Sequence, residues 1–86
     1  MDEREKFVQE VLKVAGQVEK RLQKYEAEVE VGFDADSYYI FVRLPKGRRA
    51  SREFIAELEE IGLVYVPGVN NWGYVGKFGK YPPFKL

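Results

Sequence analysis

Residues 37–45 have the sequence SYYIFVRLP, the only run of this chain in which both alternating sets of side chains are mostly apolar. Successive side chains of a strand lie on opposite faces. Tyr38, Ile40 and Val42 therefore lie on one face of a strand. Tyr39 and Phe41 lie on the other face. We expect a central strand with other parts of the protein packed against both of its faces.

Residues 3–25, which precede this strand, have the pattern of an amphipathic helix. Apolar residues recur at spacings of three and four, which places them on one helical face. Gly16 costs about 1 kcal/mol relative to alanine in a helix and indicates a kink or a close approach. We expect the apolar face to pack on the sheet of its own chain, with a homodimer through this helix as the alternative. The apolar residues are Val8, Val11, Ala15, Val18, Leu22 and Tyr25.

Local signals also predict the elements on either side of the central strand. Residues 27–33 alternate as a strand, and residues 34–37 have the Asp and Ser content of a turn. Ser51 is a favourable N-cap for a second helix over residues 52–61. Gly62 is typical of a left-handed helix end.

Two further strands are predicted in the last third of the chain, over residues 63–66 and 72–78, with a tight turn near 69–72. The proline-containing segment 79–86 is a short irregular tail, because proline cannot continue a ladder. The element order is α-β-β-α-β-β in a single domain, residues 1–86. We expect an α+β two-layer sandwich with two helices on one face of a four-stranded, mainly antiparallel sheet. A crossover that makes the second and third strands a parallel pair is the alternative.

Composition excludes several functions. The chain has no cysteine and no histidine, which removes disulfides, zinc fingers and the usual general base. It has no threonine and only two serines, so nucleophilic triads have no support. We expect a non-catalytic protein without metal or cofactor. The absence of a long apolar run and of a secretion signal predicts a cytoplasmic protein that does not enter membranes. The high charged content and the lack of cysteine resemble a thermophile's protein.

Charge is distributed unevenly although the net charge is zero. Residues 1–42 carry ten acidic and six basic side chains, a net charge of −4. Residues 43–86 carry eight basic and four acidic side chains, a net charge of +4. Such asymmetry indicates an anionic partner for the basic half, either a nucleic acid or an acidic protein.

A basic cluster precedes and opens the second predicted helix. A helix N-terminus already carries partial positive charge and free N–H groups. Further cations there are unfavourable alone, but they cooperate with the helix in binding a phosphate or a carboxylate. The alternative is a solvated basic loop whose charges are balanced by the glutamates of the helix. The cluster consists of Arg43, Lys46, Arg48, Arg49 and Arg52.

A second signal lies in residues 72–81, WGYVGKFGKY, where aromatic residues alternate with lysine and glycine and no acid intervenes. Aromatic faces stack on unpaired bases while lysines neutralise phosphates in sequence-tolerant single-strand binders. The alternative is that the aromatic rings fill the core and the glycines permit an irregular edge strand. The candidate binding residues here are Trp72, Tyr74, Lys77, Phe78, Lys80 and Tyr81.

Three stretches carry a partial family resemblance: YYIFVRLP at 38–45, REFIAEL at 52–58 and IGLVYVPG at 61–68. Together they resemble the C-terminal small domain of PLP-dependent fold-type I aminotransferases. In that family an arginine near the end of the chain grips the substrate carboxylate, whereas this sequence ends FKL. The large domain with its Schiff-base lysine has no counterpart. The resemblance implies the fold alone and no activity.

The leading hypothesis is a small module that binds single-stranded or structured RNA or DNA. The basic loop would meet phosphates, and some of the C-terminal aromatic residues would stack on bases. The alternative is a protein-interaction or assembly module that acts through the first helix and the charge asymmetry.

Overall fold

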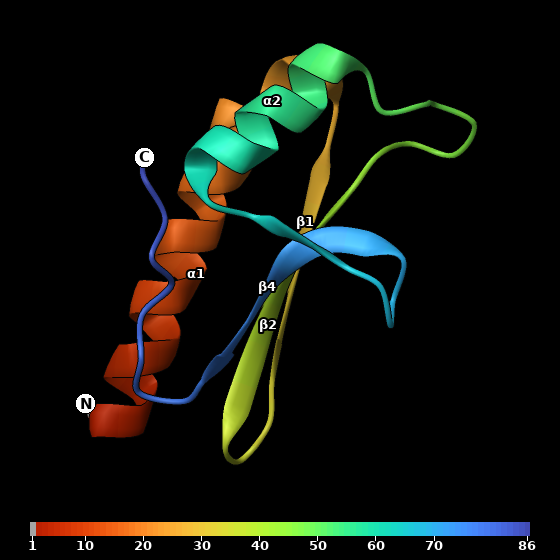
Figure 1. Ribbon diagram of the computed structural model, residues 1–86. Helices are drawn as coiled ribbons and strands as arrows, with labels where there is room; N and C mark the ends of the chain where they lie inside the picture. The colour runs from red at the N-terminus through yellow and green to blue at the C-terminus, as the bar shows by residue number, and fades with distance from the viewer. Residues whose placement is uncertain (1) are drawn as a thin grey trace.

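The computed structural model describes residues 2–86, which form two helices packed on a four-stranded sheet (Figure 1). The predicted α+β class and the α-β-β-α-β-β order are confirmed. The elements are α1 (Glu3–Arg21), the short 3-10 helix η1 (Gln23–Tyr25), β1 (Glu28–Phe33), β2 (Ser37–Arg43), α2 (Arg52–Ile61), β3 (Val64–Val66) and β4 (Asn71–Lys77). In the described chain no helix is long and apolar enough to cross a membrane.

The sheet has the strand order β1-β2-β4-β3, and every neighbouring pair is antiparallel. The segment 37–43 is an interior strand, as predicted: Val42 lies opposite Val29 of β1 on one side and Trp72 of β4 on the other. Strands β2 and β3 run in the same direction, but β4 lies between them. The alternative of a crossover that makes β2 and β3 parallel therefore holds for their direction, but the two strands are not hydrogen-bonded to each other.

The helix ends follow local chemistry. The Asp2 carboxylate caps α1 by accepting a hydrogen bond from the backbone N–H of Glu5, and the Ser51 hydroxyl caps α2 by accepting from Phe54. Gly62 ends α2 with a φ of 111°, the predicted left-handed stop. The first helix ends earlier than predicted, because the chain tightens into η1 and then turns at Glu26, whose φ of 59° is also left-handed.

The core lies between the helices and one face of the sheet. Val18 of α1 and Leu22, the C-cap of that helix, meet Leu58 of α2 over Val42 of the central strand. A second cluster joins the N-terminal half of α1 to the other half of β2 and consists of Phe7, Val11, Tyr38 and Ile40. The even-numbered side chains of β2 therefore hold both helices on the same face of the sheet (Figure 1).

The C-terminal tail is irregular, as predicted, yet it packs closely on the domain. It runs back along α1 (Figure 1). The backbone N–H of Lys85 donates to the carbonyl of Ile61 over 2.8 Å, and the Tyr38 hydroxyl donates to the carbonyl of Lys80 over 2.6 Å. Phe84 packs against both core clusters. The tail therefore covers part of the core.

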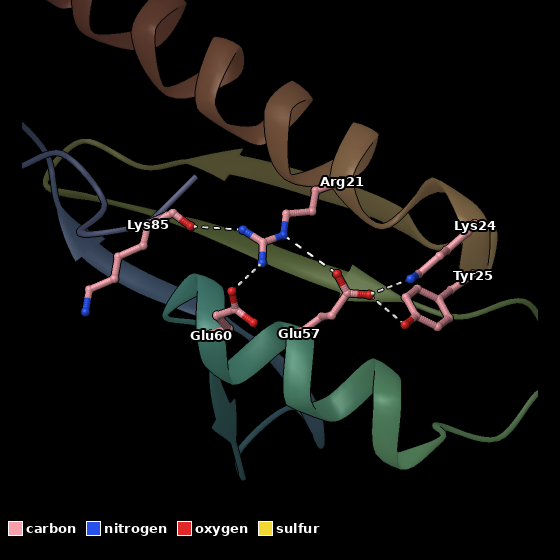
Figure 2. A network of polar contacts seen from close by, with 6 residues as sticks. All are labelled: Arg21, Lys24, Tyr25, Glu57, Glu60 and Lys85. Atoms are coloured by element: carbon pink, nitrogen blue, oxygen red, sulfur yellow. Dashed lines mark hydrogen bonds and ion pairs between the residues drawn. The ribbon is translucent and has the colours of Figure 1, made fainter.

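A polar network ties α1, α2 and this tail together (Figure 2). Arg21 lies 3.0 Å from a Glu60 oxygen and 3.7 Å from a Glu57 oxygen, and it donates to the carbonyl of Lys85. Glu57 also accepts from the Tyr25 hydroxyl over 2.6 Å. Two of the four glutamates of α2, Glu57 and Glu60, are thus paired with Arg21 of α1 and not with the basic loop.

The opposite face of the sheet is open. Both helices lie on the other side, and no element of residues 2–86 packs over the side chains of Tyr39 and Phe41. The expectation that β2 is covered on both faces is therefore wrong. The alternation of apolar residues was read correctly, but one of the two apolar sets remains partly exposed to solvent.

Candidate functional site

The open face of the sheet is defined by residues directly opposite one another in the ladder. Cross-strand partners share a face, so the partners of Tyr39 and Phe41 belong to this surface. It is aromatic in the middle, acidic along β1 and apolar toward β3. The open face consists of Glu28, Glu30, Gly32, Tyr39, Phe41, Arg43, Val64, Val66, Asn71, Gly73, Val75 and Lys77.

Two aromatic rings occupy its centre. Tyr39 and Phe41 stack on each other with ring centroids 4.9 Å apart and planes at 27°. The Tyr39 ring lies over Gly32 of β1, where an added Cβ would be 2.2 Å from ring atoms. The Phe41 ring lies against Gly73 of β4, where an added Cβ would be 2.3 Å from the ring. Glycine on both neighbouring strands therefore lets the two rings settle onto the sheet and form one aromatic surface.

Polar groups frame this aromatic pair on the β1 side. Glu30 forms an ion pair with Arg43 and accepts a hydrogen bond from the Tyr39 hydroxyl over 3.2 Å. The guanidinium of Arg43 is still largely exposed. A shallow hollow of about 610 Å³ lies beside the rings and is also lined by Val69 and Asn71. An aromatic ligand edge or a flexible side chain fits a hollow of this kind.

The basic loop is only partly neutralised by the protein's own acids. Arg48 lies 3.1 Å from a Glu26 oxygen and donates to the carbonyl of Tyr25. Lys46, Arg49 and Arg52 are exposed, and the described chain places no carboxylate within ion-pairing distance of them. The loop begins directly after Arg43, the last residue of β2. Its cations therefore lie beyond the end of the open face at which the hollow is found.

The C-terminal aromatic residues lie elsewhere. The ladder places Trp72 opposite Val42 and Tyr74 opposite Ile40, on the helix-covered face, where both pack against the core. Phe78 also packs against the core, with its ring 4.5 Å from that of Phe7. These three rings are partly buried and pack against the core, as the alternative of core packing expected, so they do not lie on the open face with Tyr39 and Phe41.

The remaining predicted site residues have separate locations. Lys77 lies on the open face, opposite Ser37 at the start of β2. Lys80 is exposed in the tail, where its carbonyl holds the Tyr38 hydroxyl. Tyr81 is 52% exposed, but its ring lies 5.0 Å from Phe7 at the N-terminal end of α1. Of the predicted residues, the structure thus groups Arg43 and Lys77 on the open face, with the loop adjoining it.

Sequence reasoning missed Tyr39 and Phe41 as site residues. Their alternation with the core set was visible, and two aromatic residues at spacing two on a central strand were the available signal. That pattern also fits a strand buried on both faces, which is how it was interpreted.

The groups on this surface are aromatic, carboxylate and guanidinium side chains. Within residues 2–86 there is no group of three His, Cys, Asp or Glu side chains placed to hold a metal ion. Stacking, hydrogen bonding and charge pairing are the interactions that the face offers.

Comparison with protein-family models, curated proteins and solved structures finds no match to this chain. The resemblance of residues 37–68 to the aminotransferase small domain stays a prediction.

Proposed function

We propose that this protein binds single-stranded nucleic acid across the open face of its sheet, with the basic loop holding the phosphate backbone. One observation carries the proposal: the stacked Tyr39–Phe41 pair lies on glycines in the centre of a sheet face that neither helix covers. Each base stacked on an aromatic side chain contributes about 1–3 kcal/mol, and this contribution tolerates any base. Two adjacent rings suit two successive unpaired bases.

The charges near the rings favour one path for the strand. Glu28 and Glu30 line the β1 side and repel phosphate, whereas Lys77 lies on β4 at one end of the face. Arg49 and Arg52 follow the other end, beyond Arg43. A phosphate backbone that runs along the β4 side, from Lys77 toward the basic loop, keeps its distance from the acids and meets a cation at both ends.

The second candidate function is assembly with protein partners through the first helix. It rests on Leu12, which is 44% exposed on α1. Of the apolar stripe, Val11, Ala15, Val18 and Leu22 are buried in the chain's own core, whereas Val8 and Tyr25 are only partly buried. One exposed leucine is a small surface for a helix-mediated homodimer, so the geometry favours the open sheet face as the functional surface.

Fluorescence anisotropy with labelled oligonucleotides tests the proposal. Mixed-sequence single-stranded DNA and RNA of about 10–16 nucleotides, within the known range of site sizes, and the matching duplexes are titrated over a salt series. We expect single strands to bind better than duplexes, with an affinity that falls as salt rises. Phe41→Ala is expected to weaken binding about tenfold, because one stacked base is lost.

Tyr65→Ala is the matched control, since Tyr65 is a 46% exposed tyrosine whose register with Trp72 places it off the open face. It should bind like the parent protein. Absence of binding at low salt, or an equal loss in both variants, would contradict the proposal. Size in solution at low and high salt separates the assembly alternative, which requires a dimer.

A further inference from the structure

The outer edge of β1 is an unprotected strand edge. In the order β1-β2-β4-β3 this strand pairs only with β2. In an antiparallel pair, alternate residues direct their N–H and C=O groups away from the partner strand. The Val29 N–H is such a group, because it donates to the Glu19 carboxylate of α1 over 3.1 Å. Val31, two residues on, directs its backbone groups the same way, and no other described element bonds to them.

The two edges of the sheet differ. Strand β3 spans three residues, Val64–Val66, and short edge strands are one of the ways in which proteins avoid unwanted pairing. Strand β1 spans six residues, Glu28–Phe33, and has neither proline nor lysine along it. Only its first outward N–H is occupied, by Glu19. Of the two edges that the structure describes, β1 is therefore the longer, and its backbone groups are available from Val31 onward.

A groove runs along this edge, between β1 and α1. Its apolar part has a volume of about 210 Å³ and lies directly beside Val29 and Val31. It is lined by Leu12, Ala15, Gly16, Glu19, Val29 and Val31. Gly16 widens the groove: a Cβ built on it meets no atom within 4 Å. Gly16, which has no side chain, and the exposed Leu12 therefore both line a cleft between α1 and the edge of β1.

The groove continues toward the C-terminal end of α1 and becomes acidic. A second hollow of about 520 Å³ shares Gly16 and Glu19 with the first and adds Glu26 and Glu28. Lys20 is the only cation that lines it. The surface along the edge is thus apolar at one end and negatively charged at the other, within the half of the chain that carries a net charge of −4.

We infer that this edge and groove bind an extended segment of another protein by strand addition, and that the segment alternates apolar and basic residues. Main-chain hydrogen bonds to β1 supply affinity in this mode, and alternate side chains supply specificity. Every second side chain of the added strand lies over the groove between α1 and β1 and should be apolar. The intervening side chains lie beside Glu28 and Glu30 and should be lysine or arginine.

A second copy of this chain fits the edge poorly. An antiparallel pair of two β1 strands would bring the Glu28 and Glu30 rows of both copies together, and like charges opposite one another destabilise a sheet. A basic strand from a different protein meets the same carboxylates favourably. This site shares Glu28 and Glu30 with the open face but uses neither the Tyr39–Phe41 pair nor the basic loop, so the inference does not depend on nucleic-acid binding.

NMR titration of the full chain tests the inference with a defined probe, an eight-residue peptide of alternating valine and lysine. We expect chemical-shift changes along Glu28–Phe33 and at least tenfold slower hydrogen exchange of the Val31 amide, which gains an acceptor. The control peptide alternates valine and glutamate and should not bind. Equal binding of both peptides, or shift changes confined to Tyr39, Phe41 and the open-face residues of β4, would overturn the inference.

The variant Gly16→Leu tests the groove itself. The new side chain has room, and replacing a helical glycine favours the helix, so the fold is retained while the groove is filled. We expect at least tenfold weaker binding of the valine–lysine peptide. Gln17→Leu adds the same side chain one position on, at an exposed residue outside the groove, and should bind like the parent. Unchanged binding in Gly16→Leu, or a peptide-free dimer with a protected Val31 amide, would overturn the inference.

Discussion

The Tyr25 hydroxyl donates a 2.6 Å hydrogen bond to Oε2 of Glu57 and so joins the end of the first helical segment to α2 (Figure 2). Lys24 lies 3.4 Å from the same oxygen, and Arg21 lies 3.7 Å from the other. The hydrogen bond from Tyr25, together with these two cations, lowers the pKa of the Glu57 carboxyl below its ordinary value. One carboxylate therefore holds two helices together through three side chains of the preceding segment.

This arrangement predicts a loss of stability in acid. A carboxyl whose pKa is lower in the folded state stabilises the fold above its unfolded pKa of about 4.3, and this contribution disappears as pH falls through the folded value. The parent chain should therefore lose free energy of unfolding below about pH 4.5. In Glu57→Gln the acid-dependent loss should be smaller and the melting temperature at pH 7 lower. Urea titrations at several pH values measure the acid-dependent loss, and thermal unfolding at pH 7 measures the melting temperature.

Glu59→Gln is the control for this prediction, because the Glu59 side chain is exposed and forms no ion pair among the described residues. Its stability at neutral pH should match that of the parent. An identical pH dependence in the parent and Glu57→Gln would show that the network contributes nothing measurable.

Tyr38 predicts a second pH effect, at the alkaline end. Burial raises the pKa of Tyr38 to about 12, with a smaller contribution from Tyr74, and its hydroxyl donates to the carbonyl of Lys80. A group with a raised folded pKa stabilises the fold fully below its unfolded pKa of about 10 and loses that contribution as pH rises toward 12. Ultraviolet titration of the phenolates should show one of the six tyrosines ionising late, together with unfolding.

Tyr38→Phe should remove this late step and lower the free energy of unfolding at pH 7 by about 1 kcal/mol, because one hydrogen bond is lost while the ring is kept. Tyr65→Phe serves as the comparison, since Tyr65 is exposed and lies on the edge strand. If the last tyrosine to ionise is unchanged in Tyr38→Phe, the assignment of the buried phenol is wrong.

Gly32 and Gly73, which contact the aromatic pair, predict different changes in stability when each is replaced by alanine. A Cβ at Gly73 would lie 2.2 Å from the backbone carbonyl oxygen of Ile40, so the central strands must separate. Gly73→Ala is expected to destabilise the protein by about 1–3 kcal/mol, the usual cost of overpacking. A Cβ at Gly32 meets only the far end of the Tyr39 ring, which can rotate away. Gly32→Ala should therefore change stability little.

Chemical denaturation of Gly73→Ala and Gly32→Ala measures this difference in stability. Oligonucleotide binding by the same variants measures the effect on the proposed function. Gly32→Ala displaces the Tyr39 ring from its position on the sheet, so it should weaken the proposed stacking without unfolding the chain. Equal stabilities of the two alanine variants would mean that the close contact at Gly73 relaxes freely.

Much of the fold could be predicted because its signals are local. The caps at Ser51 and Gly62 and the periodicity of the first helix are set by neighbouring residues, so the elements were predicted within a few positions. The strand order was not predicted, because the pairing of β2 with β4 joins segments that lie about thirty residues apart in the sequence. Packing of the tail through Phe84 was not predicted either, since its proline-rich sequence has no periodicity.

The candidate site was predicted only in part, and register explains why. The run WGYVGKFGKY fits a stacking surface and a core strand equally well until its partner is known. Pairing with β2 aligns Trp72 and Tyr74 with the core face and leaves Val75 and Lys77 on the open face. A one-residue change of register would exchange the two sets. The basic loop, which depends on no pairing, was located directly from the sequence.

The basic loop predicts a difference between two neighbouring arginines. Arg48 is paired with Glu26 at 3.1 Å, whereas Arg49 is exposed and has no ion pair within the described chain. A phosphate that binds Arg48 must displace a carboxylate, so most of its gain is offset, while Arg49 is available.

If nucleic acid binds as proposed, Arg49→Ala should weaken it about three- to tenfold and reduce the slope of log affinity against log salt by about 0.7, the value for one phosphate contact with a single strand. Arg48→Ala should change both quantities less, and Lys13→Ala, on the exposed side of α1, should change neither. Equal effects of Arg48→Ala and Arg49→Ala, measured by anisotropy over the same salt series, would show that the loop acts only through its total charge.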